Sequence, residues 1–161
     1  MKTLVIYSSK YGNTSKIATK IAAAISASSD VKLLLVDAVN YTDIQQADVV
    51  IVGSPTQAGR PTKNMQKFLD SLPPDALKDR RTAAFDTRLA LKEHGLGLEL
   101  VMKSMGFAAA HIAAGLEAKG GISVVDPEGF IVRDKEGPLK QGELDRTSEW
   151  VKKIVSAWKG L

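Results

Sequence analysis

The sequence contains no cysteine among its 161 residues and only two histidines. A chain without cysteine has no disulfide framework, no thiolate nucleophile, no CxxC redox pair and no Cys-ligated zinc or iron–sulfur site. With only two histidines to add, a metal site built from protein side chains is also disfavoured. Any redox chemistry of this chain therefore requires a bound organic cofactor.

Long hydrophobic runs and a strong excess of one charge are missing as well. The first apolar stretch ends at Ser8, too short for a signal-peptide core, and no uncharged run approaches the length of a membrane span. Basic residues exceed acidic ones by only four, and the densest basic cluster is "KDRR" at 78–81, whereas nucleic-acid binders concentrate such residues. We expect a cytoplasmic protein without membrane insertion or a nucleic-acid partner.

The residues that are present describe a globular protein, with 44% hydrophobic and 25% charged residues. The length predicts one domain over residues 1–161. Apolar segments rich in branched residues predict buried strands, and their nearly continuous hydrophobicity is typical of a parallel sheet covered on both faces. These segments are 3–7, 31–36, 48–53, 82–85 and 121–125.

Helical patterns separate the predicted strands. Ile17, Ile21 and Ile25 recur at four-residue spacing, a short helix fits within 37–47, and a further helix follows Pro61. Apolar residues at helical spacing also run from 98 to 116 and from 151 to 158, and they predict two later helices. The segment 126–142 is interpreted as a surface loop, and 89–100 as a loop or flap. The alternation predicts an α/β, doubly wound, five-stranded parallel sheet of order 2-1-3-4-5, with right-handed crossovers and helices on both faces.

In such a sheet, ligands bind beyond the carboxyl ends of the strands where the winding reverses. The loop "SSKYGNT" at 8–14 leads from the first strand into a helix, whose free amides and dipole favour an anion. It matches neither GxxxxGK[ST] nor GxGxxG, so a phosphate monoester fits better than a nucleoside triphosphate or a dinucleotide. Taken alone, the loop is also compatible with an ordinary strand-to-helix turn.

Four segments together resemble the flavodoxin family. The stretch "YSSKYGNT" resembles the S/T-x-T-G-N-T loop that holds the phosphate of FMN in flavodoxins, with Lys10 and Tyr11 at positions where small residues are usual. The segments "GSPTQAGRPTKNMQKFL" and "AAFDTRL" resemble the loops on the two sides of the flavin ring, and "EGPLKQGELDRTSEWVKKI" resembles the C-terminal segment. The resemblance implies a flavodoxin-like fold and FMN as the cofactor.

The resemblance also implies the residues of the site. The phosphate would be held by Ser9, Lys10, Tyr11, Gly12, Asn13 and Thr14, and the ring would lie between Pro55, Thr56, Gln57, Ala58 and Gly59 on one side and Asp86, Thr87 and Arg88 on the other. Gly59 would ease a change of the peptide beside flavin N5. No catalytic acid, base or nucleophile is implied.

Two departures from the flavodoxin pattern concern the flavin environment. Neither ring loop carries the Trp or Tyr that commonly stacks on the flavin, and this chain is basic where typical flavodoxins are acidic. Arg60, Arg88 and Lys92 lie in or beside these loops, with Asp86 as the opposing charge, and His94 lies nearby. Because the reduced flavin is an anion, we expect a hydroquinone couple less negative than that of an acidic flavodoxin.

Three functions are compatible with these features. The first is an electron carrier that cycles FMN through semiquinone and hydroquinone states and serves redox partner proteins, as a monomer or weak homo-oligomer. The alternative is an FMN-dependent NAD(P)H:quinone oxidoreductase, in which Arg60 and Arg88 attract nucleotide phosphates. The third is a flavin-free interaction module that shares only the fold.

Overall fold

All the strands in the part of the chain that the computed structural model describes, residues 1–90 and 106–159, belong to one parallel sheet. They are β1 (Lys2–Tyr7), β2 (Asp30–Leu35), β3 (Val49–Pro55), β4 (Arg81–Leu89), β5 (Ile122–Ser123) and β6 (Glu128–Val132). Their order is β2-β1-β3-β4-β5, with β6 also paired to β4. The predicted order 2-1-3-4-5 and the flavodoxin-like fold class are therefore confirmed.

The fifth strand position is divided between β5 and β6. Ile122 lies opposite Arg81 at the start of β4, and Glu128 lies opposite Phe85 farther along it. Residues 124–127 separate the two pieces. The prediction of one strand at 121–125 followed by a surface loop to 142 was therefore wrong for 128–132. This segment is a strand because Phe130 and Val132 are buried at alternate positions against the sheet.

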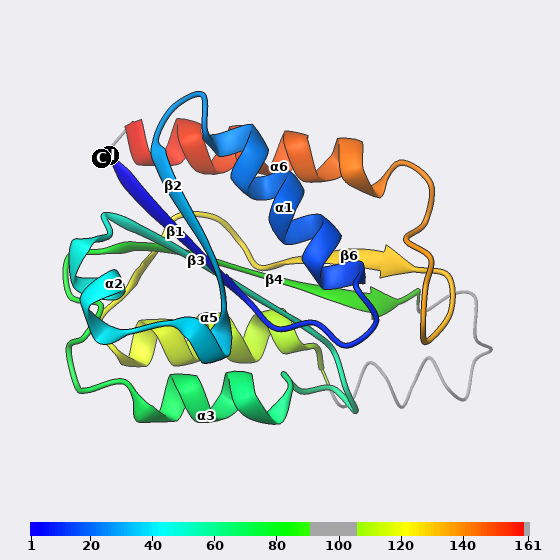
Figure 1. The fold of residues 1–161 in the computed structure, drawn as a ribbon, viewed down its shortest axis with the longest axis horizontal. Coiled ribbons are helices and arrows are strands. Elements are labelled where there is room, and N and C mark those ends of the chain that lie inside the picture. The colour runs from blue at the N-terminus through cyan, green and yellow to red at the C-terminus, as the bar shows by residue number, and fades with distance from the viewer. Residues whose placement is uncertain (91–105, 160–161) are drawn as a thin grey trace.

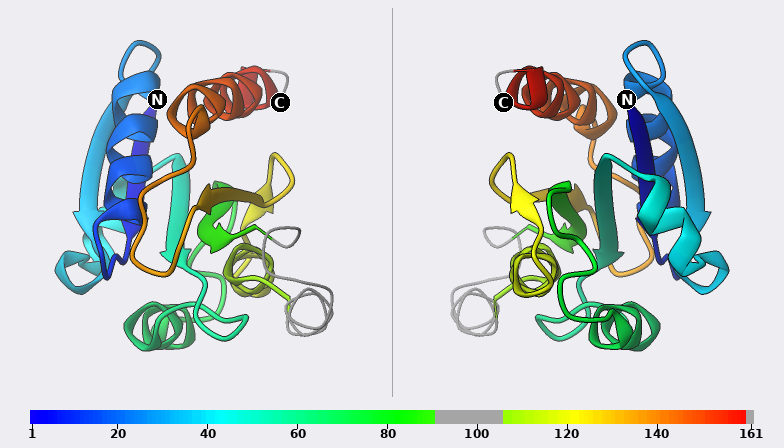
Figure 2. Two further views of the ribbon diagram at one scale, coloured as in Figure 1. Left: turned by 90° about the vertical axis from the view of Figure 1, so that its right-hand side faces the viewer. Right: turned by 90° about the vertical axis from the view of Figure 1, so that its left-hand side faces the viewer.

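Helices cover both faces of the sheet (Figures 1 and 2). Helices α1 (Asn13–Ile25) and α6 (Glu143–Lys159) pack on one face, and α3 (Lys63–Ser71) and α5 (Ala108–Ala118) pack on the other. The short η1 (Val36–Ala38) and α2 (Tyr41–Gln46) connect β2 to β3. The helices predicted at 17–25, within 37–47, after Pro61 and at 151–158 are confirmed as α1, α2, α3 and α6. The predicted flap at 89–100 begins instead with the end of β4 at Leu89, and its residues from 91 on lie outside the described residues, as does the first part of the 98–116 stripe.

Two hydrophobic cores explain why the strands are apolar at consecutive positions. Leu4 and Ile6 of β1 join the core beneath α3 and α5, whereas Val5 between them joins the core beneath α1 and α6. In the second core, the Trp150 ring lies edge-on to those of Phe85 and Phe130, at centroid distances of 6.1 and 5.9 Å. Among the described helices, none is both long and apolar enough to cross a bilayer.

Candidate functional site

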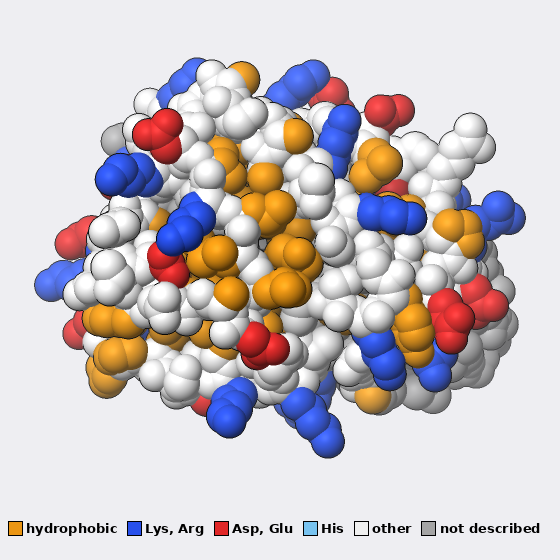
Figure 3. Space-filling view, viewed as in Figure 1, with side chains coloured by type: hydrophobic (Ala, Val, Ile, Leu, Met, Phe, Trp, Pro, Cys, Tyr) orange, Lys and Arg blue, Asp and Glu red, His pale blue; other side chains and the backbone are white. Residues whose placement is uncertain are grey.

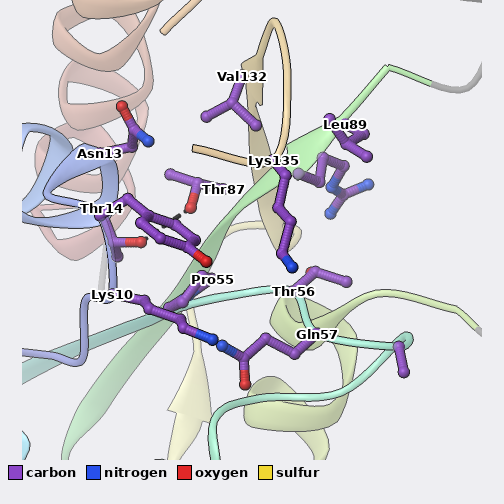
Figure 4. Close-up of a pocket in the computed structure, with 13 residues that line it drawn as sticks. Lys10, Asn13, Thr14, Pro55, Thr56, Gln57, Thr87, Leu89, Val132 and Lys135 are labelled. Carbon is purple, nitrogen blue, oxygen red and sulfur yellow. Dashed lines mark hydrogen bonds between the residues drawn. The ribbon is translucent and has the colours of Figure 1, made fainter. Parts of the chain in front are cut away.

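A cavity of about 450 Å³ opens at the carboxyl ends of β1, β3 and β4 (Figure 4). We call it the strand-end cavity. It lies where the doubly wound topology predicts a ligand site, because the crossover direction reverses between β1 and β3. Its lining consists of Lys10, Tyr11, Asn13, Thr14, Pro55, Thr56, Gln57, Ala58, Thr87, Arg88, Leu89, Val132 and Lys135. Most of the residues predicted from sequence therefore meet around one cavity.

The loop between β1 and α1 presents unused hydrogen-bond donors. Gly12 has a φ of 91° and immediately precedes α1, a conformation that favours glycine. The Ser9 hydroxyl accepts the N–H groups of Gly12 and Ser15 at 3.2 and 3.4 Å, so Ser9 and Gly12 shape the loop without lining the cavity. The backbone N–H groups of residues 10, 11, 13 and 14 donate to no acceptor in the described part of the chain. These N–H groups and the positive end of the helix dipole would favour an anion at this position.

The Asn13 side chain is already engaged with a distant segment. Its amide Nδ2 donates to the carbonyl oxygen of Glu136 at 3.1 Å. The next residue, Gly137, packs closely against the Asn13 side chain, because a Cβ atom at position 137 would lie 2.7 Å from Asn13 Oδ1. Asn13 thus fastens the segment 133–138 to the first turn of α1, and its backbone N–H remains available to a ligand.

A buried contact joins α1 to β4 at the base of the cavity. The hydroxyl oxygens of Thr14 and Thr87 lie 2.8 Å apart, and both residues are almost fully buried. The Thr56 N–H donates to the Thr87 carbonyl oxygen at 2.9 Å, which fixes the end of β3 to β4. These contacts bring the three predicted loops together.

The wall after β3 is a tight turn. Gln57 and Arg60 exchange two backbone hydrogen bonds of 2.8 and 3.0 Å across Ala58 and Gly59. Both central residues have positive φ, 47° for Ala58 and 78° for Gly59, as a two-residue turn of this hand requires. Ala58 lines the cavity, whereas Gly59 is buried behind it.

The opposite wall contains a buried ion pair. Arg88 Nε and Nη2 donate to the two carboxylate oxygens of Asp86, each at 2.7 Å. The Asp86 side chain is fully buried, does not line the cavity, and also accepts the Ala109 N–H at 2.9 Å. Burial raises the pKa of Asp86 above its usual value, and the hydrogen bonds and charge of Arg88 offset part of this rise.

Arg88 is also held from its other sides. Its guanidinium carbon lies 3.7 Å from the centroid of the Phe107 ring. Gly129 of β6 leaves room for the guanidinium, because a Cβ atom there would lie 2.1 Å from Arg88 Nε. Asp86 of the same strand and two segments distant in sequence thus fix the orientation of Arg88 beside the cavity.

Sequence reasoning missed three residues of the lining, Leu89, Val132 and Lys135. Leu89 is the last residue of "AAFDTRL", one position beyond the predicted site. The prediction that the strand ends at 85 and a loop follows was wrong, because residues 86–89 continue β4 in register with β6. Val132 and Lys135 come from the segment interpreted as a surface loop, and the alternation of Phe130 and Val132 is the sequence signal that points to a strand there. His94 and Lys92 lie outside the described residues. Within residues 1–90 and 106–159, no group of three or more potential metal ligands occurs.

Comparisons with known proteins agree with this geometry. The model of a family described as "Flavodoxin domain" matches residues 4–104. A flavodoxin of Clostridium saccharobutylicum is 33% identical over 89 residues, which cover 54% of this chain and 56% of that protein. A flavodoxin of Aquifex aeolicus (strain VF5) is 37% identical over 73 residues, 44% of this chain and 40% of that protein. The matches thus span about half the length of these relatives.

A likeness in structure extends over nearly the whole chain. The crystal structure of oxidised Flavodoxin 1 from Bacillus cereus superimposes with a TM-score of 0.77 at 17% sequence identity. The superposition covers 97% of this chain and 98% of that chain. At 17% sequence identity, this structural similarity establishes the fold alone.

Proposed function

The chain belongs to the flavodoxin family, whose members bind FMN, and from this premise we propose that it is an electron-transfer protein serving redox partner proteins. The observation that carries the proposal is the set of unused amides at the start of α1, which open into the strand-end cavity. An FMN phosphate is the kind of anion that such a helix terminus binds. A cavity of about 450 Å³ is in the range of pockets that hold one cofactor.

In this proposal, the residues of the site have two kinds of role. The backbone amides of residues 10, 11, 13 and 14 and the Lys10 ammonium group hold the phosphate, in a loop shaped by Ser9 and Gly12. The flavin ring is bordered by the Pro55–Gly59 wall and by Thr87 and Arg88, with Asp86 orienting Arg88.

When bound, FMN supplies one-electron and two-electron redox chemistry. The residues of this chain bind and orient it and exclude water from its buried side. No Asp or Glu is among the described residues that line the cavity, so proton-transfer chemistry by a carboxylate is not part of the proposal.

Spectroscopy of the purified protein tests the proposal. We expect a yellow protein that releases FMN on denaturation, or an apoprotein that binds added FMN with one-to-one stoichiometry. Failure to bind FMN would contradict the proposal and favour the flavin-free module. NADH and NADPH then separate carrier from enzyme: persistent colour without a partner supports the carrier, and rapid bleaching supports the alternative NAD(P)H:quinone oxidoreductase.

The proposal also covers the domain organisation of the chain, its cellular location and its oligomeric state. One domain over residues 1–161 is supported by the single sheet, in which segments from β1 to β6 take part. A cytoplasmic location and a monomeric or weakly oligomeric state stay predictions, which size-exclusion chromatography and localisation of the tagged protein test directly.

A further inference from the structure

Among the described residues, three cationic side chains line the strand-end cavity, and they differ in how their charge is balanced. Arg88 is neutralised by its bidentate contact with Asp86. Lys10 belongs to the phosphate loop, with its Nζ 5.5 Å from the centroid of the Tyr11 ring. The Lys135 ammonium group has no anionic partner in the described part of the chain. Among the described residues, Lys135 is therefore the cation that lines the cavity outside the phosphate loop without an ion-pair partner.

The backbone that carries Lys135 is held in place. Gly137 N–H donates to the Asp134 carbonyl oxygen at 2.9 Å, which closes a turn with Lys135 at its second position. The Asp134 carboxylate accepts the Lys135 N–H at 2.8 Å, and the Arg133 N–H donates to the Pro138 carbonyl oxygen at 2.9 Å. The Asn13 contact then joins this turn to α1. The position of Lys135 is thus set by the fold, although its side chain is exposed.

Whereas the Lys10 side chain enters the cavity from the loop after β1, the Lys135 side chain enters it from the segment 133–138. Figure 4 shows it crossing the cavity from the 133–138 segment toward the wall that carries Thr56. This is the wall after β3, where the proposed function places the flavin ring. The segment itself adjoins the phosphate loop through the Asn13 contact, so the ring-side assignment rests on where the Lys135 side chain points.

We propose that Lys135 is the cation of the flavin-ring subsite and that it raises the reduction potential of bound FMN. This inference rests on the proposed function. Reduction adds negative charge to the ring, and a cation beside it stabilises the reduced form more than the oxidised form. Arg88, which the sequence suggested for this role, contributes less because Asp86 offsets its charge.

The test compares Lys135→Gln with Lys135→Arg, which keeps the charge, and with Lys153→Gln, which removes an exposed charge of α6 that does not line the cavity. Each FMN-loaded protein is titrated potentiometrically. For Lys135→Gln we expect the affinity for reduced FMN to fall about tenfold relative to oxidised FMN, which is about 30 mV for a two-electron couple. Lys135→Arg and Lys153→Gln should keep the wild-type potential.

The affinities of each apoprotein for FMN and for riboflavin, which lacks the phosphate, show whether Lys135 acts on the flavin ring or on the phosphate. A ring-side Lys135 predicts that Lys135→Gln keeps the wild-type ratio of FMN to riboflavin affinity. A selective loss of FMN affinity would instead make Lys135 a phosphate ligand and overturn the inference, as would an unchanged potential in Lys135→Gln. If wild-type protein binds no FMN at all, the proposed function itself fails, so the two failures are distinct.

Discussion

At the scale of single residues, Asp86 and Arg88 show how a charged pair is built into the wall of a cofactor site. The Asp86 carboxylate is inaccessible to solvent, and such a group is tolerated only when its oxygen atoms are satisfied. Arg88 supplies two parallel hydrogen bonds, and the Ala109 N–H supplies another at the start of α5. The pair therefore fixes the position of α5 relative to β4 as well as the orientation of Arg88.

Arg88→Lys is expected to destabilise the apoprotein by about 2 kcal/mol. Lysine keeps the positive charge but forms neither the bidentate contact with Asp86 nor the planar stack on Phe107. Urea unfolding measures the change. Arg60→Lys is the matched control, because Arg60 is exposed and has no side-chain partner in the described residues. Equal stabilities of the two variants would contradict the structural role of Arg88.

At the scale of elements, the segment 133–138 and the first turn of α1 depend on each other. Asn13 holds the segment, and the segment carries Lys135 and Val132 to the cavity. This contact joins residues more than a hundred positions apart in sequence, so the end of the chain completes a site that begins at its start.

Gly137→Ala tests this coupling. Gly137 has a φ of 104° and approaches Asn13 closely, whereas Gly142 has a φ of 90° with nothing within 4 Å of the added Cβ position. Both alanine variants should lose about 1 kcal/mol of stability from the backbone conformation. Only Gly137→Ala should also weaken FMN binding, by several-fold, because it displaces the segment from Asn13. Equal FMN affinities in the two variants, measured by flavin fluorescence, would exclude the coupling.

A second contact between elements fastens α6 to β6. The Glu143 carboxylate accepts the Ile131 N–H at 2.7 Å and pairs with Arg146, which also contacts Glu128 at 2.8 Å. Burial opposes the charged form of Glu143, but the hydrogen bonds of Arg146 and Ile131 outweigh it and lower the pKa of this carboxyl below its usual 4.5. Glu143 is therefore anionic at neutral pH.

Glu143→Gln is expected to lower the free energy of unfolding by about 1–2 kcal/mol at pH 7. Because the folded-state pKa lies below the unfolded value, the electrostatic contribution is present above pH 4.5 and is lost as pH falls through the folded-state pKa. The stability difference between wild type and variant should therefore shrink in acid. Urea titrations from pH 7 down to acid measure it, and a difference that grows in acid would contradict the assignment.

At the scale of the whole molecule, ligand binding should stabilise the fold as a unit, because the strand-end cavity is lined by residues from β3, β4, β6 and the start of α1. FMN at a hundredfold excess over its dissociation constant is expected to add about 2.7 kcal/mol to the free energy of unfolding. Riboflavin at the same concentration should add less, since it lacks the phosphate that the α1 amides bind. Thermal unfolding compares the two, and equal shifts would argue against the phosphate site.

Much of the architecture followed from sequence patterns. The apolar segments at 3–7, 31–36 and 48–53 became β1, β2 and β3 because strands buried on both faces need apolar side chains at consecutive positions. The helix after Gly12 was equally clear from its isoleucine spacing. The strand β6 was missed because its burial depends on pairing with β4, which a short segment beginning with Glu and Gly does not reveal.

The sequence by itself determined the sheet order 2-1-3-4-5, the flavodoxin family and the loop between β1 and α1 that we propose holds a phosphate. These are properties of local pattern: hydrophobic periodicity, glycine placement and short motifs act over a few neighbouring residues. Only the tertiary structure decided that Asp86 neutralises Arg88, that Asn13 holds the 133–138 segment, and that Lys135 faces the cavity. Those outcomes depend on which distant side chains meet, and charge balance in a site is set by such contacts.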